Sequence, residues 1–379
     1  MTHLLVTNDF PPKVGGIQVY LWELWRRLDP SSYAVLTASS DPGASEFDAE
    51  QASLGVRIDR IPQKVMLPTP ALVRRIREAA AAVDAKLVVL DPALPVGLLG
   101  PSLGLPYAVV LHGAEVTVPG RLPGARQMLA RVLGGADLAI CAGTYPAAEG
   151  RRAAGRRMPP VVEVPPGVDV ERFHPLIPKE RTDARRRLGL PLDGPLVVSV
   201  SRLVPRKGMD VLVEAAGALM PSFPDLTVAI GGTGRDMGRI KSQIAGSGAD
   251  VRLLGRVPDD MLPSLYASAD VFVMACRDRW MGLEQEGFGI VFLEAASCEV
   301  PQIAGRSGGA YEAVVDGRTG IVVSDPKDPG QVAAALRRLL LNPQLRQAMG
   351  QAGRQRAQES FAYDLLARKL ADALHDVGG

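Results

Sequence analysis

The stretch "PLVVSVSRLVPRKGMD", residues 195–210, contains the structural unit from which this chain is built. It begins with a continuous apolar run, passes through a basic turn and ends where a helix is expected to begin. An apolar run without polar alternation indicates a strand that is buried on both faces, as in parallel sheets. We therefore predict an α/β fold in which the loops after the strands carry the chemistry.

Similar apolar runs recur along the chain in two series. The first comprises 3–9, 33–39, 86–91, 107–113 and 137–143, and the second comprises 195–203, 226–234, 251–257 and 271–277. Helical patterns separate them, for example at 16–28, 69–83 and 123–134. Strands that alternate with helices in two series predict two doubly wound, Rossmann-like domains that face a cleft.

The boundary between these domains is expected in 161–176, which is rich in proline and glycine: Pro165, Pro166, Gly167 and Pro175. We predict a first domain over 1–168 and a second over 169–360. The final segment, 361–379, has leucines at every fourth position, which predicts an amphipathic helix that needs an apolar surface to cover: Leu366, Leu370 and Leu374.

The composition narrows the function classes. The hydrophobic share of 47% indicates a folded globular protein, and the aromatic share of 5% with a net charge of +2 argues against nucleic-acid binding. Three scattered cysteines, Cys141, Cys276 and Cys298, indicate a reducing compartment. Neither a signal peptide nor a membrane-spanning run is evident, so we expect a cytoplasmic protein. Basic segments at 121–135 and 150–158 are solvated faces or contacts to an anionic membrane surface.

Two strand-end loops have the composition of anion sites. In "NDFPPKVGGIQ" (8–18), Gly15 and Gly16 allow positive φ and close backbone approach before a helix, although a tight turn would explain them equally well. In "SRLVPRKGMD" (201–210), Arg202 and Lys207 converge on one anion if the loop folds back, with Arg206 beside them. A solvated basic turn is the simpler explanation, but the position after a buried strand favours a diphosphate site.

The segment "EQEGFGIVFLEAASCEVPQIAGRSGGAYE" (284–312) contains two carboxylates around an apolar run. Glu286 to Gly289 is expected to be a loop, and Ile290 to start a helix whose free amides, from Phe288 to Ile290, favour an anion. Glu286 is placed to hold sugar hydroxyls and Glu294 to hold a ribose. The alternative is that the glutamates only complement the helix dipole.

One histidine lies at a strand end in "LHGAEV" (111–116), where His112 either has a structural partner or contacts a substrate. Taken together, "GG", "HGAE", "PPGVDVERF", "SRLVPRKG", the Glu286-x7-Glu294 pattern and "SGGAYEAV" resemble the retaining GT-B glycosyltransferases with a Glu-x7-Glu motif. The segments "TNDFPPKVGGIQ", "VMLP" and "EGFGIVFLEA" are similar to those of actinobacterial mannosyltransferases that use GDP-mannose to modify phosphatidylinositol mannosides.

This resemblance implies a role for each candidate residue. Arg202 and Lys207 would bind the donor diphosphate, Glu286 the transferred sugar and Glu294 the ribose. The remaining donor contacts would be made by Gly15, Gly16, Phe288, Gly289 and Ile290. His112, a catalytic candidate together with Arg202, Lys207 and Glu286, would lie near the C6 hydroxyl and the anomeric centre of the sugar. His112 and Gln18 would contact the acceptor. Some relatives carry a histidine where this chain has Ala114. In the family the last helix crosses back onto the first domain.

The resemblance also implies a mechanism without metal or another cofactor. No metal-spaced cluster is evident, and a retaining enzyme without a carboxylate nucleophile implies front-face substitution, in which the leaving phosphate helps deprotonate the acceptor hydroxyl. We expect a peripheral enzyme on the inner membrane face, acting on a glycolipid. Two alternatives stay open: a UDP-sugar donor with a soluble acceptor, and a nucleotide-sugar isomerase or binding protein. Nucleobase choice would depend on loops 252–257 and 278–285, and the oligomeric state stays open.

Overall fold

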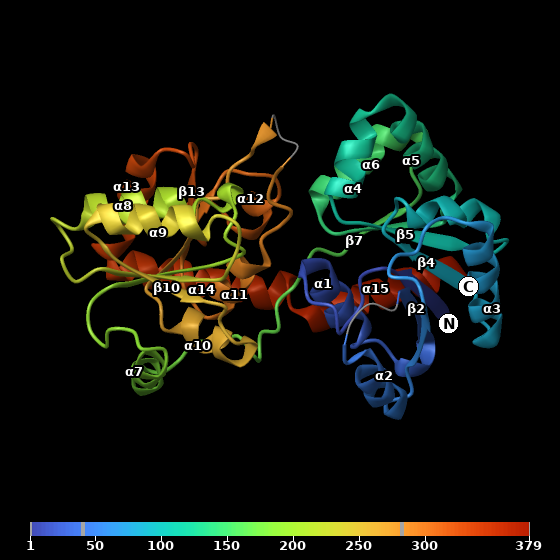
Figure 1. Cartoon of the computed structure of the whole chain (residues 1–379), viewed down its shortest axis with the longest axis horizontal. Helices are drawn as coiled ribbons and strands as arrows, with labels where there is room; N and C mark the ends of the chain where they lie inside the picture. Colours follow the sequence, from blue (N-terminus) through green and yellow to red (C-terminus); the bar gives the residue numbers. More distant parts are fainter. Residues whose placement is uncertain (1, 39–41, 281–283, 379) are drawn as a thin grey trace. The chain divides into compact units, whose positions relative to one another are not determined.

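The computed structural model describes residues 2–38, 42–280 and 284–378. The chain forms two compact units (Figure 1). Unit 1 comprises Met1–Pro166 together with Tyr363–Gly379, and unit 2 comprises Gly167–Ala362. Unit 1 is therefore discontinuous in sequence, whereas unit 2 is one continuous segment.

Unit 1 is built on a seven-stranded parallel sheet in the order β3-β2-β1-β4-β5-β6-β7. Its strands are β1 (His3–Thr7), β2 (Tyr33–Ala38), β3 (Arg57–Ile61), β4 (Leu87–Asp91), β5 (Tyr107–Leu111), β6 (Leu138–Cys141) and β7 (Val161–Glu163). The strand order reverses between β1 and β4, where Thr7 lies opposite Asp91. Ligands of doubly wound sheets bind at such a switch point, beyond the carboxyl ends of the strands.

Unit 2 contains a six-stranded parallel sheet in the order β10-β9-β8-β11-β12-β13. Its strands are β8 (Leu196–Val200), β9 (Thr227–Gly231), β10 (Asp250–Gly255), β11 (Val271–Met274), β12 (Gln302–Gly305) and β13 (Gly320–Val323). The switch point of this sheet lies between β8 and β11. The predicted fold class, two Rossmann-like α/β domains, is confirmed.

Helices cover both sheets. Those of unit 1 are α1 (Gly16–Trp25), α2 (Ala44–Ser53), α3 (Pro70–Ala82), α4 (Ala114–Arg121), α5 (Pro123–Gly135), α6 (Thr144–Ala154) and α15 (Tyr363–Gly378). Those of unit 2 are α7 (Pro178–Arg187), α8 (Met209–Leu219), α9 (Met237–Ser247), α10 (Leu262–Ala267), α11 (Ile290–Ser297), α12 (Ala310–Ala313), α13 (Pro329–Leu340) and α14 (Pro343–Ser360). The short helices η2 (Val96–Ser102) and η4 (Pro205–Lys207) follow β4 and β8.

Four strands were not predicted, because none of them contains a long continuous run of apolar residues. The edge strand β3 has the sequence RIDRI and is largely exposed or half-buried. The edge strand β7 has three residues and lies at the start of 161–176, the segment that is expected to contain the domain boundary. The strands β12 and β13 have four residues each. Edge and short strands bury few side chains, and a continuous apolar run is not needed to form them.

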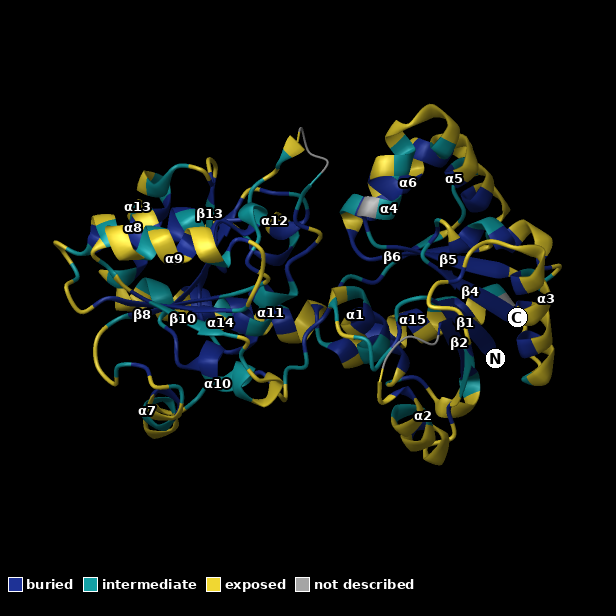
Figure 2. Ribbon diagram, in the orientation of Figure 1, coloured by how far each residue is buried: buried dark blue, intermediate teal, exposed yellow. Residues whose placement is uncertain are grey.

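The cores lie between the sheets and their helices, and Figure 2 shows buried strands within each unit. One core of unit 1 joins α1 to α15, because Leu24 and Trp25 share a buried cluster with Leu366, Leu370 and Leu374. The leucines are at most 3% exposed. Leucines at every fourth position line one side of α15, and this side packs into the core of unit 1.

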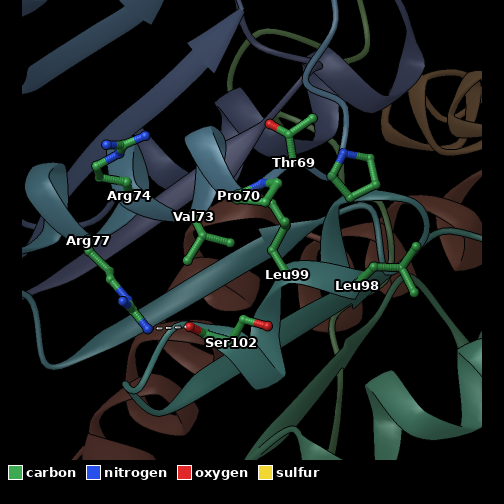
Figure 3. A pocket seen from close by; sticks show the side chains of 9 residues that line it. Thr69, Pro70, Val73, Arg74, Arg77, Leu98, Leu99 and Ser102 are labelled. Carbon is green, nitrogen blue, oxygen red and sulfur yellow. Dashed lines mark hydrogen bonds between the residues drawn. The ribbon is translucent and has the colours of Figure 1, made fainter.

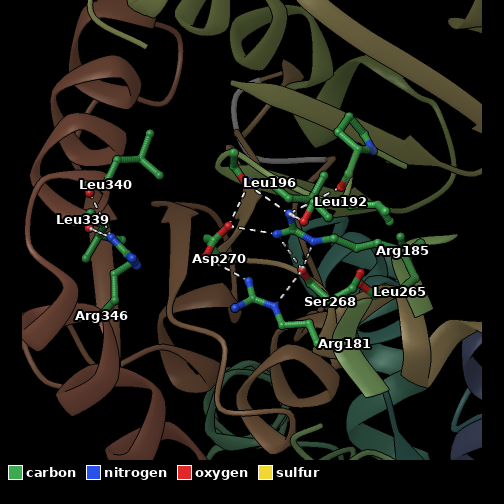
Figure 4. Close-up of polar contacts among 12 residues, drawn as sticks. Arg181, Arg185, Leu192, Leu196, Leu265, Ser268, Asp270, Leu339, Leu340 and Arg346 are labelled. Carbon is green, nitrogen blue, oxygen red and sulfur yellow. Dashed lines mark hydrogen bonds and ion pairs between the residues drawn. The ribbon is translucent and has the colours of Figure 1, made fainter. Parts of the chain in front are cut away.

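A partly buried ionic cluster anchors the first helix of unit 2 (Figure 4). Arg181 and Arg185 of α7 contact the Asp270 carboxylate at 2.8 and 3.1 Å, and this carboxylate also accepts the Leu196 amide at 2.8 Å. Burial would raise the pKa of Asp270, but Arg181, the Leu196 amide and Arg185 together lower it. Since each charge has a partner, α7 is held to the start of β8 and to the turn before β11.

Candidate functional site

The switch point of unit 2 holds a carboxylate between two cations. Arg206 Nη1 donates to Glu286 Oε2 at 2.7 Å, and Lys207 Nζ lies 2.7 Å from the same oxygen. Lys207 and Glu286 are each 7% exposed. The loop after β8 and the loop before α11 therefore meet through these side chains.

The two cations determine the charge of Glu286. Burial alone would raise the pKa of this carboxyl group, but Lys207 and Arg206 lower it below its ordinary value. Glu286 is therefore ionised at neutral pH, and it acts only as a hydrogen-bond acceptor.

A second carboxylate, Glu284, lies close to Arg206 from the other side. Its oxygens are 3.1 Å from Arg279, 3.7 Å from Arg206 and 3.9 Å from Arg235. Cations outnumber carboxylates in these loops, so the carboxyl end of this sheet favours an anionic ligand.

Arg202 differs from its neighbours because it is exposed and contacts no partner among the residues that the structure describes. Its loop is nevertheless fixed, since the amides of Ser201 and Leu203 donate to the carbonyls of Gly231 and Thr233 at 3.1 and 2.9 Å. A Cβ atom on Gly232, which has φ +124°, would lie 1.9 Å from the Ser201 carbonyl oxygen. The turn 231–234, with the sequence "GGTG", thus positions the loop that carries a free guanidinium.

The loop before α11 provides backbone donors. Gly289 caps α11 with φ 85°, as expected for a glycine in the left-handed region. The amides of Phe288, Gly289 and Ile290 donate to no acceptor within the described parts of the chain. Such amides at a helix N-terminus bind anions.

The apolar run after Gly289 is anchored unevenly. Phe292 and Leu293 are at most 1% exposed, whereas Ile290 and Val291 are only partly buried. Val291 still packs against the core, but less completely than the two residues after it. The reason is helical geometry, because consecutive residues on a helix point in different directions.

Glu294 lies further along α11 and is half-buried. Burial raises the pKa of this carboxyl group, and the nearby Tyr266 hydroxyl and the charge of Arg172 only partly offset the rise. Glu286 and Glu294 therefore differ electrostatically, since the first is surrounded by cations and the second is not.

A third loop, after β12, fixes the backbone of Glu286. Ser307 Oγ accepts the Glu286 amide at 3.1 Å and donates to Asp278 at 2.6 Å, and the Gly309 amide donates to the Glu286 carbonyl at 3.0 Å. A Cβ atom on Gly308 would lie 2.0 Å from that carbonyl oxygen. Ser307 and Asp278 were not recognised from the sequence, although "SGG" directly after a strand was the available signal. Residues 281–283 of loop 278–285 lie outside the described residues.

The switch point of unit 1 holds a histidine and a carboxylate. His112 Nε2 lies 2.5 Å from Asp91 Oδ1, and Thr7 Oγ1 donates to Asp91 Oδ2 at 2.5 Å. Asp91 is fully buried. Burial would lower the pKa of His112, but Asp91 raises it above its ordinary value. The sequence analysis assigned Asp91 no role, because it treated this residue as part of a buried strand. A carboxylate at a strand end, directly before Pro92, was the available indication of a polar site.

The turn after β5 fixes the direction of His112. Glu115 accepts the amides of His112 and Gly113, the latter at 3.0 Å, and the Tyr20 ring packs edge-on against the imidazole at 5.4 Å. The side chain of Ala114 lies outside the described residues. His112 therefore has a structural partner on one ring nitrogen, Nε2.

The glycine loop after β1 differs from its expectation. Gly15 is extended with φ 170°, and neither Gly15 nor Gly16 has the positive φ that was predicted. A Cβ atom on Gly15 would lie 2.2 Å from Gln18 Oε1, because Gln18 Nε2 is held by Asp9 at 2.5 Å. A Cβ atom on Gly16 would meet nothing within 4 Å, so the backbone there is open to a close approach.

A pocket of about 660 Å³ in unit 1 contains none of the predicted site residues (Figure 3). It is lined by Pro68, Thr69, Pro70, Val73, Arg74, Arg77, Leu98, Leu99 and Ser102. Arg77 donates to the carbonyls of Ser102 and Leu103, which joins α3 to the end of η2.

Within the described residues, no group of three or more His, Cys, Asp or Glu side chains is arranged to hold a metal ion. The described residues also contain no helix that is long and apolar enough to cross a membrane.

Both units match known families. Residues 180–356 match the family described as "Glycosyl transferases group 1", and residues 14–172 match "Glycosyltransferase Family 4". The chain is also 40% identical over 378 residues to the GDP-mannose-dependent alpha-(1-6)-phosphatidylinositol monomannoside mannosyltransferase of Mycolicibacterium smegmatis, covering 98% of this chain and 97% of the relative. This chain belongs to the group 1 glycosyltransferase family.

Further relatives of this glycosyltransferase also align with it over nearly its whole length. It is 36% identical over 375 residues to the GDP-mannose-dependent monoacylated alpha-(1-6)-phosphatidylinositol monomannoside mannosyltransferase of Corynebacterium glutamicum, covering 98% of this chain and 97% of the relative. Among solved structures, HepE of Anabaena in complex with UDP matches with a TM-score of 0.82 and 20% identity, over 99% of this chain and all of HepE. That likeness shows a common fold.

Proposed function

We propose that this glycosyltransferase transfers α-mannose from GDP-mannose to a phosphatidylinositol mannoside-type glycolipid, with retention of configuration. The observation that supports a sugar-diphosphate donor is the ionised Glu286 beside Lys207 and Arg206, whose loop also carries the exposed Arg202. The choice of mannose and of the lipid rests on the relatives, which align with this chain over nearly its full length.

The residues around Glu286 suit a donor. Arg202 and Lys207 bind the diphosphate and stabilise the charge that develops on it, while the amides from Phe288 to Ile290 contact phosphate and sugar. Glu286 accepts hydrogen bonds from the sugar hydroxyls, and Glu294 accepts those of the ribose. On unit 1, Gly15 and Gly16 allow the donor a close approach, and His112 and Gln18 contact the acceptor.

The chemistry that we propose is front-face substitution. The bond from the anomeric carbon to the leaving phosphate oxygen breaks, a bond to the acceptor oxygen forms on the same face, and the acceptor proton passes to the leaving phosphate. The pairing of Glu286 with two cations supports this proposal, because a carboxylate held in this way is a weak nucleophile but a firm acceptor. The protein supplies position and charge.

A donor panel tests the proposal. Nucleotide release is measured with GDP-mannose, UDP-glucose and UDP-N-acetylglucosamine, each with and without a phosphatidylinositol mannoside, and NMR of the product gives its anomeric configuration. We expect acceptor-dependent GDP release and an α product. Turnover only with a UDP-sugar and a soluble acceptor would replace this proposal with the first alternative, and conversion of the donor without nucleotide release would indicate an isomerase.

We further propose that the enzyme acts as a peripheral protein on the inner face of the cell membrane. Helix α5 supports this, because Arg126 and Arg131 are exposed, as are Leu122 (55%) and Met128 (47%). Co-sedimentation with vesicles of phosphatidylglycerol and phosphatidylcholine should weaken in an Arg126→Gln/Arg131→Gln variant. The matched control is Lys241→Gln/Arg338→Gln, which removes the same charge from unit 2. Equal binding of both variants would refute a role of α5.

A further inference from the structure

The two cations on Glu286 have different tasks if Lys207 also serves the donor. Lys207 Nζ and Arg206 Nη1 both lie 2.7 Å from the same oxygen, Oε2 of Glu286. A diphosphate that draws the Lys207 ammonium toward itself competes with Glu286 for that group. If a buried carboxylate loses its only cation, the free energy of its charged form rises steeply. The carboxylate then takes up a proton.

We propose that Arg206 is a positioning residue, which holds Glu286 charged and in place while Lys207 turns to the donor diphosphate. This inference rests on the proposed function, because that function assigns Lys207 to the diphosphate and Glu286 to the sugar.

The anchoring of Arg206 suits this task. Its Nε lies 3.7 Å from Glu284 while Nη1 binds Glu286, so the planar guanidinium spans two carboxylates. Its carbonyl oxygen accepts the Arg277 amide at 2.9 Å, which ties η4 to the loop after β11. Lysine, by contrast, ends in a compact ammonium group with rotatable donors, which can exchange one acceptor for another.

The other groups around Glu286 leave no substitute for Arg206. Burial, and secondarily the charge of Glu286, raise the pKa of the Cys276 thiol to about 12, so the thiol is neutral. Ser307 binds the Glu286 amide and has Asp278 behind it, and Glu284 repels rather than neutralises. Among the described residues, Lys207 and Arg206 are the only cations in contact with the Glu286 carboxylate.

The first test separates the free enzyme from the donor complex. In Arg206→Gln, Lys207 still pairs with Glu286 in the free enzyme, but Glu286 loses both cations once the diphosphate engages Lys207. The acid limb of the kcat profile, which reports the donor complex, should therefore move to higher pH, while that of kcat/KM should stay near the wild type. At about pH 6 we expect kcat to fall about tenfold more than at about pH 8, and Arg206→Lys to restore part of it.

The matched control is Arg235→Gln. It removes a cation 3.9 Å from Glu284 that does not contact Glu286. Both acid limbs should stay at their wild-type positions in this variant. If Arg206→Gln lowers kcat and kcat/KM equally at every pH, or weakens GDP binding as strongly as Lys207→Gln does, then Arg206 contacts the donor directly and the proposal is wrong.

A second test needs no donor, so it distinguishes failure of this inference from failure of the proposed function. The pKa of Glu286 is followed by carboxyl ¹³C NMR, assigned with Glu286→Gln, in a Lys207→Gln protein that mimics departure of the lysine. The pKa should stay clearly below that of the Lys207→Gln/Arg206→Gln protein. Equal values would overturn the inference even if the wild type transfers mannose. If this test succeeds while the wild type releases no GDP from GDP-mannose, the donor assignment alone is wrong.

Discussion

The two units place a buried carboxylate at the same topological position but give it different partners. In unit 2, Glu286 pairs with Lys207 and Arg206. Lysine and arginine are residue types that ordinarily carry a positive charge across the physiological range. In unit 1, Asp91 pairs with His112 and Thr7, and the imidazole is a group that titrates near neutral pH. The same fold thus provides one site in which the carboxylate is paired with lysine and arginine, and one in which it is paired with a histidine that can gain or lose a proton.

This difference matches two kinds of ligand. A diphosphate has the same charge throughout the working range of pH, so permanent cations suit it. A hydroxyl group gives or accepts a hydrogen bond according to its partner. A histidine that donates Nε2–H to a carboxylate accepts through Nδ1 when it is neutral and donates through Nδ1 when it is protonated. The cores that support the two sites also differ, because unit 1 needs α15 from the far end of the sequence.

The largest effect should follow loss of the fixed charge. Lys207→Gln should lower the rate of GDP release from GDP-mannose by about 10³-fold, because transition-state charge loses its nearest cation. The control is Lys241→Gln, an exposed lysine of α9. A loss of less than about tenfold would break the comparison, since the unit 2 site would then not depend on this charge.

The packing of α15 against unit 1 should have a smaller effect than the Lys207 charge. It should still supply a substantial part of the free energy of unfolding of unit 1. Leu370→Ala removes a fully buried side chain from the cluster that contains Leu24 and Trp25. We expect the free energy of unfolding to fall by about 3 kcal/mol in urea titrations. Leu365→Ala on the same helix, where leucine is 37% exposed, is the control and should cost under about 1 kcal/mol. Equal losses would show that α15 does not complete this core.

The smallest effect should be the pH dependence of the His112 contact. Its pKa is raised above 6.5 in the folded protein, because Asp91 outweighs burial. The charged pair therefore contributes stability that is fully present below the unfolded pKa and is lost as pH rises through the folded pKa. The destabilisation by His112→Gln should thus be greater at about pH 5.5 than at about pH 8.5, by about 1 kcal/mol.

Urea titrations at both pH values measure this difference, and His375→Gln, on the exposed side of α15, is the control. A His112→Gln cost that does not change with pH would remove the contrast between a proton-based and a charge-based site.

The sequence predicted what depends on neighbours along the chain. Continuous apolar runs indicated the inner strands. The basic and acidic loops after β8 and β11 predicted a ligand site, which stays a prediction. It could not indicate pairs that depend on strand order. Thr7 and Asp91 are 84 residues apart, and Arg206 and Glu286 are 80 apart. Each pair meets only because β1 lies beside β4 and β8 beside β11.

Two other misses have local causes. The role of Gly232 follows from a contact with the Ser201 carbonyl, which no spacing rule contains. Arg206 was noticed only as a neighbour of Lys207, because a run of two cations does not show which one contacts which acceptor. The assignment of individual residues to donor and acceptor stays a prediction.

The discontinuity of unit 1 has a consequence during synthesis. Every residue of unit 2, from Gly167 to Ala362, leaves the ribosome before Leu366, Leu370 and Leu374 do. The apolar face of α1 is therefore made first but waits longest for its partner, while unit 2 has all of its strands available earlier. Unit 1 is thus the later of the two units to complete its core, and until then its exposed apolar surface is prone to aggregation.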